Sequence, residues 1–272
     1  MAEQYYDVEH NARLADYHRR YIRQQLDAVA PYKNVIHHIG TEYTGPLHFM
    51  RFWLDCIAEW EREHGQDVYV MLSATKDVQD AILADPAYRR LVDIIDIRQW
   101  SRNADGSLYA PEGGVNLAPR QYARLLDSPA VSGNDAVWNQ VAEYRMAYPD
   151  IAVVSNAGRA EGGPWISFVA GGSMCALPTV VDASFWRKTL PMAPMDALTL
   201  PGRQWGMGKA GTGYVIYCVS DELQLPLGDD HATYRLRWID PFTGAFIGRT
   251  QRVRGGASLP VPKTGVVAWL DR

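Results

Sequence analysis

Apolar residues recur at helical spacing in two stretches near the start of the chain. From about residue 11 to 30 an apolar stripe lies opposite a face rich in Arg and Gln, which predicts an amphipathic helix. The stripe consists of Leu14, Tyr17, Tyr21, Ile22, Leu26 and Val29. From Leu47 to His64 the segment LHFMRFWLDCIAEWEREH predicts a second helix, which Gly65 ends as a C-cap.

Short apolar runs follow and separate the helical patterns. Two further helices are expected at KDVQDAIL (76–83) and AVWNQVAEYRMAY (136–148). Strands are expected at NVIHHIGT (34–41), VYVMLSAT (68–75), VDIIDIRQW (92–100), IAVVSNA (151–157) and WISFVAGG (165–172). Strands that alternate with helices in this way predict a parallel sheet covered by helices.

The pattern changes after about residue 200. GYVIYCVS (213–220), ATYRLRWID (232–240), AFIGRTQRV (245–253) and GVVAWLDR (265–272) are short strands, and DPFTG (240–244) is a tight turn between two of them. The glycine-rich segments AGGS (170–173) and GMGKAGTG (206–213) are interpreted as turns, because they lack the strand-to-helix setting of a phosphate loop. We therefore expect an α/β domain over 1–204 and a small antiparallel β-sandwich over 205–272.

Composition narrows the class of function. The 272 residues are 47% hydrophobic and carry a net charge of −4 without blocks of basic residues, so nucleic acid is not expected as a partner. Nine Trp and fifteen Tyr fit a carbohydrate ligand, since aromatic rings stack on sugars. Three cysteines without C-x-x-C spacing indicate neither a disulfide framework nor a metal site, and Cys56 is expected in a helix core.

No targeting or membrane segment is expected in the sequence. The N-terminus lacks the apolar run of a signal peptide, and no stretch is apolar for the length that a membrane span needs. As written, the chain is expected in the cytoplasm and away from membranes; a missing N-terminal segment would make it periplasmic or secreted.

Glu42 is the first candidate for chemistry. It comes at the carboxyl end of the 34–41 strand, which is where α/β enzymes place functional side chains. Alternation puts Ile36, His38, Gly40 and Glu42 on one face of this strand. The alternative is a glutamate at the rim that caps the next helix. His37 and His38 point to opposite faces, so they are not expected to bind one metal ion.

Several segments together resemble a known family. They are HRRYIRQQLDAVAPYKNVIHHIGTEYTGPLHFMRFWLDCIAEWERE, VMLSATKDVQDAILADP, VDIIDIRQW, DGSLYAPEGGVNLAPRQYARLL and YRLRWIDPFTGAFIG. The chain resembles bacterial glycoside-hydrolase-like proteins with a (β/α)8 barrel and a C-terminal β-sandwich once labelled a putative collagen-binding domain, among them apiosidase-type pectin-degrading enzymes. The resemblance implies a glycoside hydrolase acting on plant or bacterial polysaccharide. It also implies that Glu42, preceded by Thr41 where Asn is common, is the general acid/base that closes the fourth barrel strand.

A glycosidase needs a second carboxylate. The best match to the family's seventh strand, 151–157, ends in Ser155 and Asn156 and offers none. Asp96 is one substitute, because it shares a strand face with Arg98 and Trp100 and would align an acid, a cation and a sugar-stacking ring. The alternative for Asp96 is an internal ion pair. Glu161 in a glycine-rich loop is the other substitute, with a solvated loop acid as its alternative.

Further residues are candidates for binding substrate. The long loop over 105–121 carries Tyr109 and Asn116, and it is expected either to form a substrate wall or to pack under the sandwich. Lys76 is expected either to contact substrate or to cap a helix. With Arg98 and Trp100 these residues make up the expected binding set; no cofactor or metal is expected.

The resemblance also implies that the barrel is incomplete. The first strand matches the family's fourth, so only strands four to eight are expected, whereas a closed barrel needs about 250 residues. An open edge predicts self-association or a partner segment that completes the barrel. Two functions therefore remain, a glycoside hydrolase and a non-catalytic carbohydrate-binding or structural remnant, and a second carboxylate facing Glu42 would distinguish them.

Overall fold

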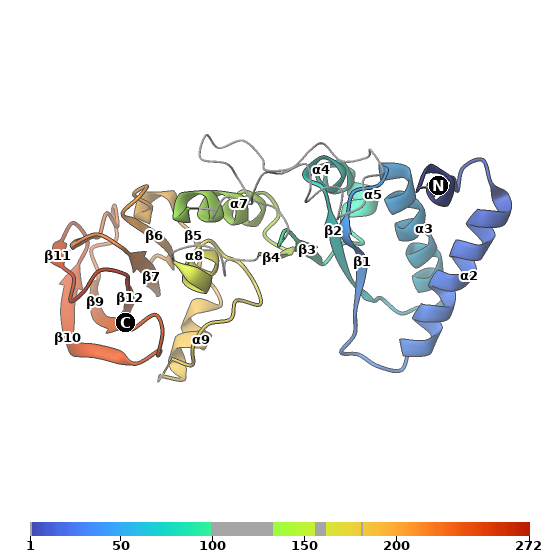
Figure 1. Cartoon of the computed structure of the whole chain (residues 1–272). Helices are drawn as coiled ribbons and strands as arrows, with labels where there is room; N and C mark the ends of the chain where they lie inside the picture. The colour runs from blue at the N-terminus through green and yellow to red at the C-terminus, as the bar shows by residue number, and fades with distance from the viewer. Residues whose placement is uncertain (1, 99–132, 156–161, 181) are drawn as a thin grey trace. The chain divides into compact units, whose positions relative to one another are not determined.

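The computed structural model describes residues 2–98, 133–155, 162–180 and 182–272, without the side chains of Ala2, Glu3 and Glu42 (Figure 1). The chain divides into two compact units. Of the described residues, 2–98 belong to unit 1, and 133–155, 162–180 and 182–272 belong to unit 2. The predicted domain boundary after residue 204 stays a prediction. Within the described ranges, no helix is both long and apolar enough to cross a membrane.

Unit 1 consists of helices and parallel strands. Its helices are α1 (Ala2–Tyr6), α2 (Ala12–Val29), α3 (Leu47–His64), α4 (Lys76–Ala84) and α5 (Pro86–Arg89). Its strands are β1 (Ile36–Tyr43), β2 (Tyr69–Ala74) and β3 (Ile94–Asp96). β2 pairs in parallel with β1 and with β3, which confirms the parallel sheet. The third strand is shorter than the predicted 92–100 segment.

The two long helices form where their apolar spacing predicts. Asn11 caps α2 by accepting a hydrogen bond from the Leu14 backbone N–H at 3.1 Å. Gly65 ends α3 in the left-handed conformation at φ 60°, as predicted. Trp60 of α3 is fully buried and donates from Nε1 to Asp27 Oδ1 of α2 at 2.7 Å, and Arg23 of α2 pairs with Glu63 of α3, so polar contacts join the two helices. Figure 1 shows both helices on the same side of β1 and β2.

The predicted buried face of α2 was partly wrong. Ile22 and Leu26 are buried as expected, but Tyr17 and Tyr21 are 50% and 53% exposed. The guanidinium groups of Arg13 and Arg20 lie over the Tyr17 ring. An amphipathic tyrosine ring that packs under arginine can stay at the surface with its hydroxyl in water, so the aromatic positions do not belong to the core stripe.

Unit 2 combines short helices with a large antiparallel sheet. Its helices are α7 (Asn134–Ala147), α8 (Gly163–Val169), α9 (Ser184–Thr189) and the 3-10 helix η2 (Asp196–Leu198). Its strands are β4 (Ala152–Val154), β5 (Ala193–Pro194), β6 (Gln204–Lys209), β7 (Gly213–Cys218), β8 (Glu222–Gln224), β9 (Thr233–Ile239), β10 (Phe246–Arg254), β11 (Ser258–Pro260) and β12 (Val266–Asp271). The four strands predicted after residue 212 are confirmed as β7, β9, β10 and β12.

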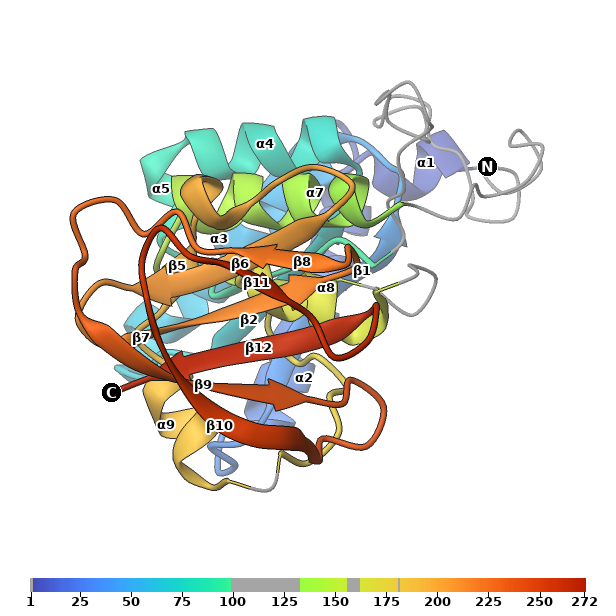
Figure 2. The same ribbon diagram turned by 90° about the vertical axis from the view of Figure 1, so that its left-hand side faces the viewer.

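Apart from β4, the strands of unit 2 form two antiparallel sheets. One has six strands in the order β10-β9-β12-β7-β6-β5, and the other pairs β11 with β8. Figure 2 shows β6, β7, β12, β9 and β10 side by side. A buried apolar core joins residues of both sheets, including Ile216, Leu236, Leu270 and Leu223. The structure thus shows antiparallel sheets, while a sandwich of the family's type stays a prediction.

The predicted strand at 165–172 is wrong, because residues Gly163–Val169 form helix α8. Trp165, Ile166 and Val169 are all buried, so the run shows no polar face from which a period could be read. Pro164 lies at the first turn of the helix, where its fixed φ favours a helix start. The Gly-Pro pair before the run was therefore the better signal.

The interpretation of residues 206–213 as turns is wrong in part. Gly206 and Gly208 lie inside strand β6, and only residues 210–212 turn the chain into β7. A Cβ atom on Gly208 would lie 2.1 Å from Cδ1 of Tyr214. Glycine is thus needed here for the close approach of β6 to the Tyr214 ring rather than for a turn.

Candidate functional site

The candidate site is a polar face of the unit 1 sheet. Register pairs His38 with Met71 and Met71 with Ile94, so these three residues share a face. Alternation places Ser73 and Asp96 on the same face, at the carboxyl ends of β2 and β3. The opposite face carries the buried apolar residues Ile39, Val70, Leu72 and Ile95, with the half-buried His37 at its amino end. One face is therefore core, and the other offers polar groups at the edge where α/β enzymes place their sites.

Asp96 is held by a bidentate pair with Arg98. Its side chain is 2% exposed, and its Oδ1 accepts from the backbone N of Arg98 at 3.0 Å and from Nε at 2.8 Å. Oδ2 accepts from Nη2 of Arg98 at 2.7 Å. Burial raises the pKa of Asp96, but the hydrogen bonds and charge of Arg98 outweigh it and hold the pKa below its ordinary value. Asp96 is thus a carboxylate at neutral pH.

His38 reaches the same carboxylate from β1. Its Nε2 lies 3.3 Å from Asp96 Oδ2 but is buried without a hydrogen bond, so the contact has the distance of an ion pair and not the alignment of a hydrogen bond. Burial lowers the pKa of His38, and the opposing effect of Asp96 is smaller. His38 is therefore neutral at neutral pH, and Nε2 has capacity for one further hydrogen bond.

Glu42 lies in β1, one residue before its end. The pairing of β1 with β2 shifts between Ile39 and Tyr43, and Gly40 takes a positive φ of 66° within this bulge. The strict alternation that put His38, Gly40 and Glu42 on one face is therefore interrupted. The side chain of Glu42 lies outside the described part of the structure, so its role as acid/base stays a prediction.

The remaining predicted site residues divide into two groups. Lys76 begins α4 and donates from Nζ to Asp80 Oδ2 at 2.8 Å along the helix. Arg98 pairs with Asp96, as described above. Trp100, Tyr109 and Asn116 lie outside the described residues, as does the alternative acid Glu161. The structure thus brings together Asp96 and Arg98 of the predicted set, and the substrate roles of all these residues stay predictions.

Sequence reasoning missed the contact of His38 with Asp96. Alternation placed His38 on the face of Glu42, but the contact with Asp96 depends on the register of β1, β2 and β3. Among the described residues, no group of three His, Cys, Asp or Glu side chains could hold a metal ion.

The arrangement sets limits on the chemistry. An ionised, fixed carboxylate can stabilise developing positive charge, accept a proton from water or attack an electrophilic carbon. It cannot donate a proton at neutral pH. A hydrolytic site built on Asp96 therefore needs a second group of higher pKa as its acid, which is the role predicted for Glu42.

Comparisons with solved structures find glycoside hydrolases. One, described only as a glycoside hydrolase, aligns with a TM-score of 0.57 and 11% identity over 96% of this chain and 69% of its own. Another, a glycoside hydrolase family 5 protein from Bacteroides vulgatus ATCC 8482, aligns with a TM-score of 0.51 and 12% identity over 96% and 67%. At such identities the likeness concerns the fold. It supports a barrel-like arrangement, although the described strands do not form a closed barrel.

A search of curated proteins finds no match. A family model does match, over residues 1–192, which takes in all of unit 1 and the first part of unit 2. The chain therefore belongs to the family described as a domain of unknown function (DUF6298).

Proposed function

We propose that the protein is a glycoside hydrolase acting on plant or bacterial polysaccharide. The observation that carries the proposal is the buried, ionised Asp96 at the carboxyl end of β3, with the neutral His38 beside it, in a fold similar to glycoside hydrolases. In this scheme Glu42 is the general acid/base and Asp96 is the second carboxylate. Arg98 orients Asp96 through its hydrogen bonds, and His38 lies beside the carboxylate.

The substrate roles follow from the sequence. Trp100, Tyr109, Asn116 and Lys76 are proposed to contact the sugar together with the exposed part of Arg98. The resemblance to apiosidase-type enzymes adds pectin-derived side chains as the first substrates to test. It also supports the proposal that the antiparallel region after residue 204 is the sandwich domain of that family, in a chain that self-associates or pairs with another segment.

A second function has one observation in its favour. Both oxygens of Asp96 are engaged by Arg98, as expected for an ion pair that fixes the end of a strand. In that case the protein is a non-catalytic carbohydrate-binding or structural relative of the enzymes. The two functions differ in what the loss of the Asp96 charge does to hydrolysis.

The test measures sugar release from pectin fragments and from arabinose-, apiose- and rhamnose-containing glycosides. Glu42→Gln and Asp96→Asn should each reduce hydrolysis by about 10²-fold or more, because each removes a proton donor or a charge needed in the transition state. Asp229→Asn, an exposed carboxylate in unit 2, is the control and should retain wild-type rates. The proposed hydrolase activity would be refuted if the wild-type protein released no sugar, or if the wild type and the three variants hydrolysed the substrates at equal rates.

A further inference from the structure

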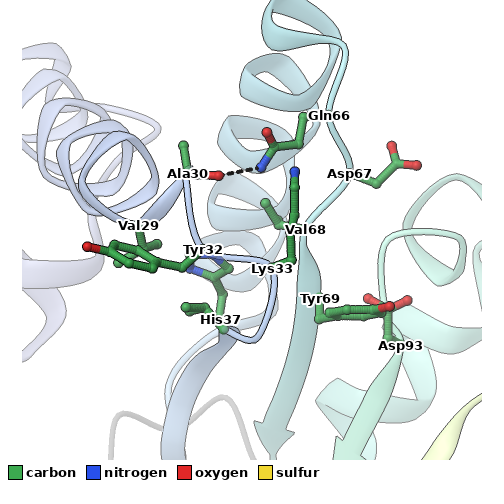
Figure 3. Close-up of a pocket in the computed structure, with 11 residues that line it drawn as sticks. Val29, Ala30, Tyr32, Lys33, His37, Gln66, Asp67, Val68, Tyr69 and Asp93 are labelled. Atoms are coloured by element: carbon green, nitrogen blue, oxygen red, sulfur yellow. Dashed lines mark hydrogen bonds between the residues drawn. The ribbon is translucent and has the colours of Figure 1, made fainter.

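A cavity lies at the amino ends of the unit 1 strands, opposite the candidate catalytic site. It has a volume of about 340 Å³ and is formed by the end of α2, the segment that leads into β1, the start of β2 and Asp93 just before β3 (Figure 3). Asp96 lies at the carboxyl ends of the strands, whereas this cavity lies at the amino ends. It is therefore distinct from the candidate catalytic site.

Two tyrosine rings at the border of the cavity are exposed to solvent. Tyr32 is 63% exposed and Tyr69 is 56% exposed, and they come from different elements, the turn after α2 and the first position of β2. Figure 3 shows the two rings on either side of Lys33. Exposed rings around a cavity offer flat apolar surfaces whose hydroxyl ends stay wet, which suits the apolar face of a sugar ring.

Charges of both signs line the same cavity. Asp67 and Asp93 supply carboxylates and Lys33 an ammonium group. Burial raises the pKa of Asp93, with the neighbouring Asp67 adding to it, while burial lowers the pKa of His37. A lysine disfavours cationic ligands, and the two carboxylates disfavour anions. A neutral polyhydroxyl ligand can bind to both kinds of charged group, because its hydroxyls donate to carboxylates and accept from the ammonium group.

The walls of the cavity are held by hydrogen bonds. Gln66 donates from Nε2 to the Ala30 carbonyl at 3.1 Å, which joins the end of α3 to the end of α2 (Figure 3). Asp93 Oδ2 accepts from the Val70 backbone N at 2.8 Å, which fixes the carboxyl beside the start of β2. These bonds fix part of the cavity wall, so a ligand would not have to order that part.

We propose that this cavity is a second sugar-binding site, which holds one neutral sugar unit between Tyr32 and Tyr69 with its hydroxyls on Asp67, Asp93 and Lys33. Its volume lies at the small end of ligand cavities, which run from about 300 to 1,000 Å³, so it fits a single unit. The site would hold a polysaccharide away from the catalytic end. The choice of plant-type sugars as ligands rests on the proposed function; the site itself does not depend on hydrolysis.

The test is saturation-transfer NMR on the full chain with arabinose, rhamnose, galactose and xylose, followed by titration of the best binder. Tyr69→Ala and Tyr32→Ala should each weaken binding by roughly tenfold, because each removes a stacking ring. Asp67→Asn should weaken it by a smaller factor. Tyr21→Ala removes a tyrosine of similar exposure on α2, outside the cavity, and should bind as wild type. Circular dichroism checks that each variant is folded.

A negative result for the second sugar-binding site can be distinguished from a negative result for the proposed hydrolase activity. Binding that depends on Tyr69 and Tyr32 but persists in Asp96→Asn supports the second site, whether or not sugar is released. No binding of any of the four sugars at millimolar concentration would overturn the second site. Equal weakening by Tyr21→Ala and Tyr69→Ala would overturn it too, and neither result bears on hydrolysis at Asp96.

Discussion

At the scale of single residues, environment decides which groups can do chemistry. The spacing of Asp96 and Arg98 predicted a shared strand face; in the structure β3 ends at Asp96, and Arg98 pairs with Asp96 from the turn that follows. The spacing could not give the sign of the pKa shift, because burial and the guanidinium act in opposite directions on Asp96. Nor could it reveal the approach of His38, which depends on the register of β1, β2 and β3.

The first prediction concerns Arg98. Arg98→Met removes the guanidinium group, whose hydrogen bonds and charge lower the pKa of Asp96. Burial, which raises the pKa, is then opposed only by the backbone N–H of residue 98 and by His38. In the wild type, the pKa of Asp96 is lower in the folded protein than in the unfolded chain, where it has the ordinary value of about 3.9. This difference stabilises the folded protein above about pH 3.9, and the stabilisation is lost as the pH falls through the folded pKa. We therefore expect Arg98→Met to lower the unfolding free energy by about 1–2 kcal/mol at pH 7, since Arg98 is half exposed.

The measurement is urea unfolding between pH 7 and pH 3. The difference between wild type and Arg98→Met should shrink as pH falls, because protonated Asp96 no longer needs the guanidinium. Arg252→Met, at an exposed position of β10, is the control and should change little at any pH. A loss of stability in Arg98→Met that is the same at every pH would contradict the linkage to Asp96.

At the scale of elements, the sequence predicts a helix or strand end best where residues next to it in the chain determine the conformation by themselves. The end of α3 at Gly65 could be predicted, because a left-handed C-cap needs glycine whatever surrounds it. Helix α8 could not be predicted, because nearly all of its apolar run is buried. Strand β6 could not be predicted either, because Gly208 is required by the close approach of the Tyr214 ring on the neighbouring strand. The bulge that follows Ile39 could not be predicted either. Because of it, alternation does not determine on which face of β1 Glu42 lies.

The second prediction tests the cap of α3. At Gly65 an added Cβ would meet no atom within 4 Å, so the only cost of a side chain is the positive φ of 60°. Gly65→Ala should therefore destabilise unit 1 by about 1 kcal/mol. Gly65→Asn serves as the matched variant and should cost less, because asparagine tolerates this conformation better. Chemical denaturation of the three proteins gives the order, and equal losses for Ala and Asn would exclude backbone strain as the cause.

At the scale of the whole molecule, the open question is how the parallel sheet is completed. β1 pairs with β2 on one side and, among the described residues, with no strand on the other. The sequence predicted both the parallel strands and a barrel with an open edge. It could not predict what covers that edge, because closure depends on contacts that lie outside any local pattern. An unpaired strand edge offers backbone donors and acceptors to another chain.

The last prediction is therefore self-association through β1. Ile36 begins this strand and is 39% exposed, so a second copy that adds to the edge would bury an apolar side chain as well as backbone groups. Light scattering should show a mass above that of the monomer that rises with concentration. Ile36→Lys should shift the distribution toward monomer, since a lysine on an edge strand opposes pairing. Phe242→Lys removes an apolar side chain that is 85% exposed in a unit 2 turn and should leave association unchanged. A wild-type protein that stays monomeric at high concentration would refute self-association, and equal effects of both lysines would place the contact away from β1.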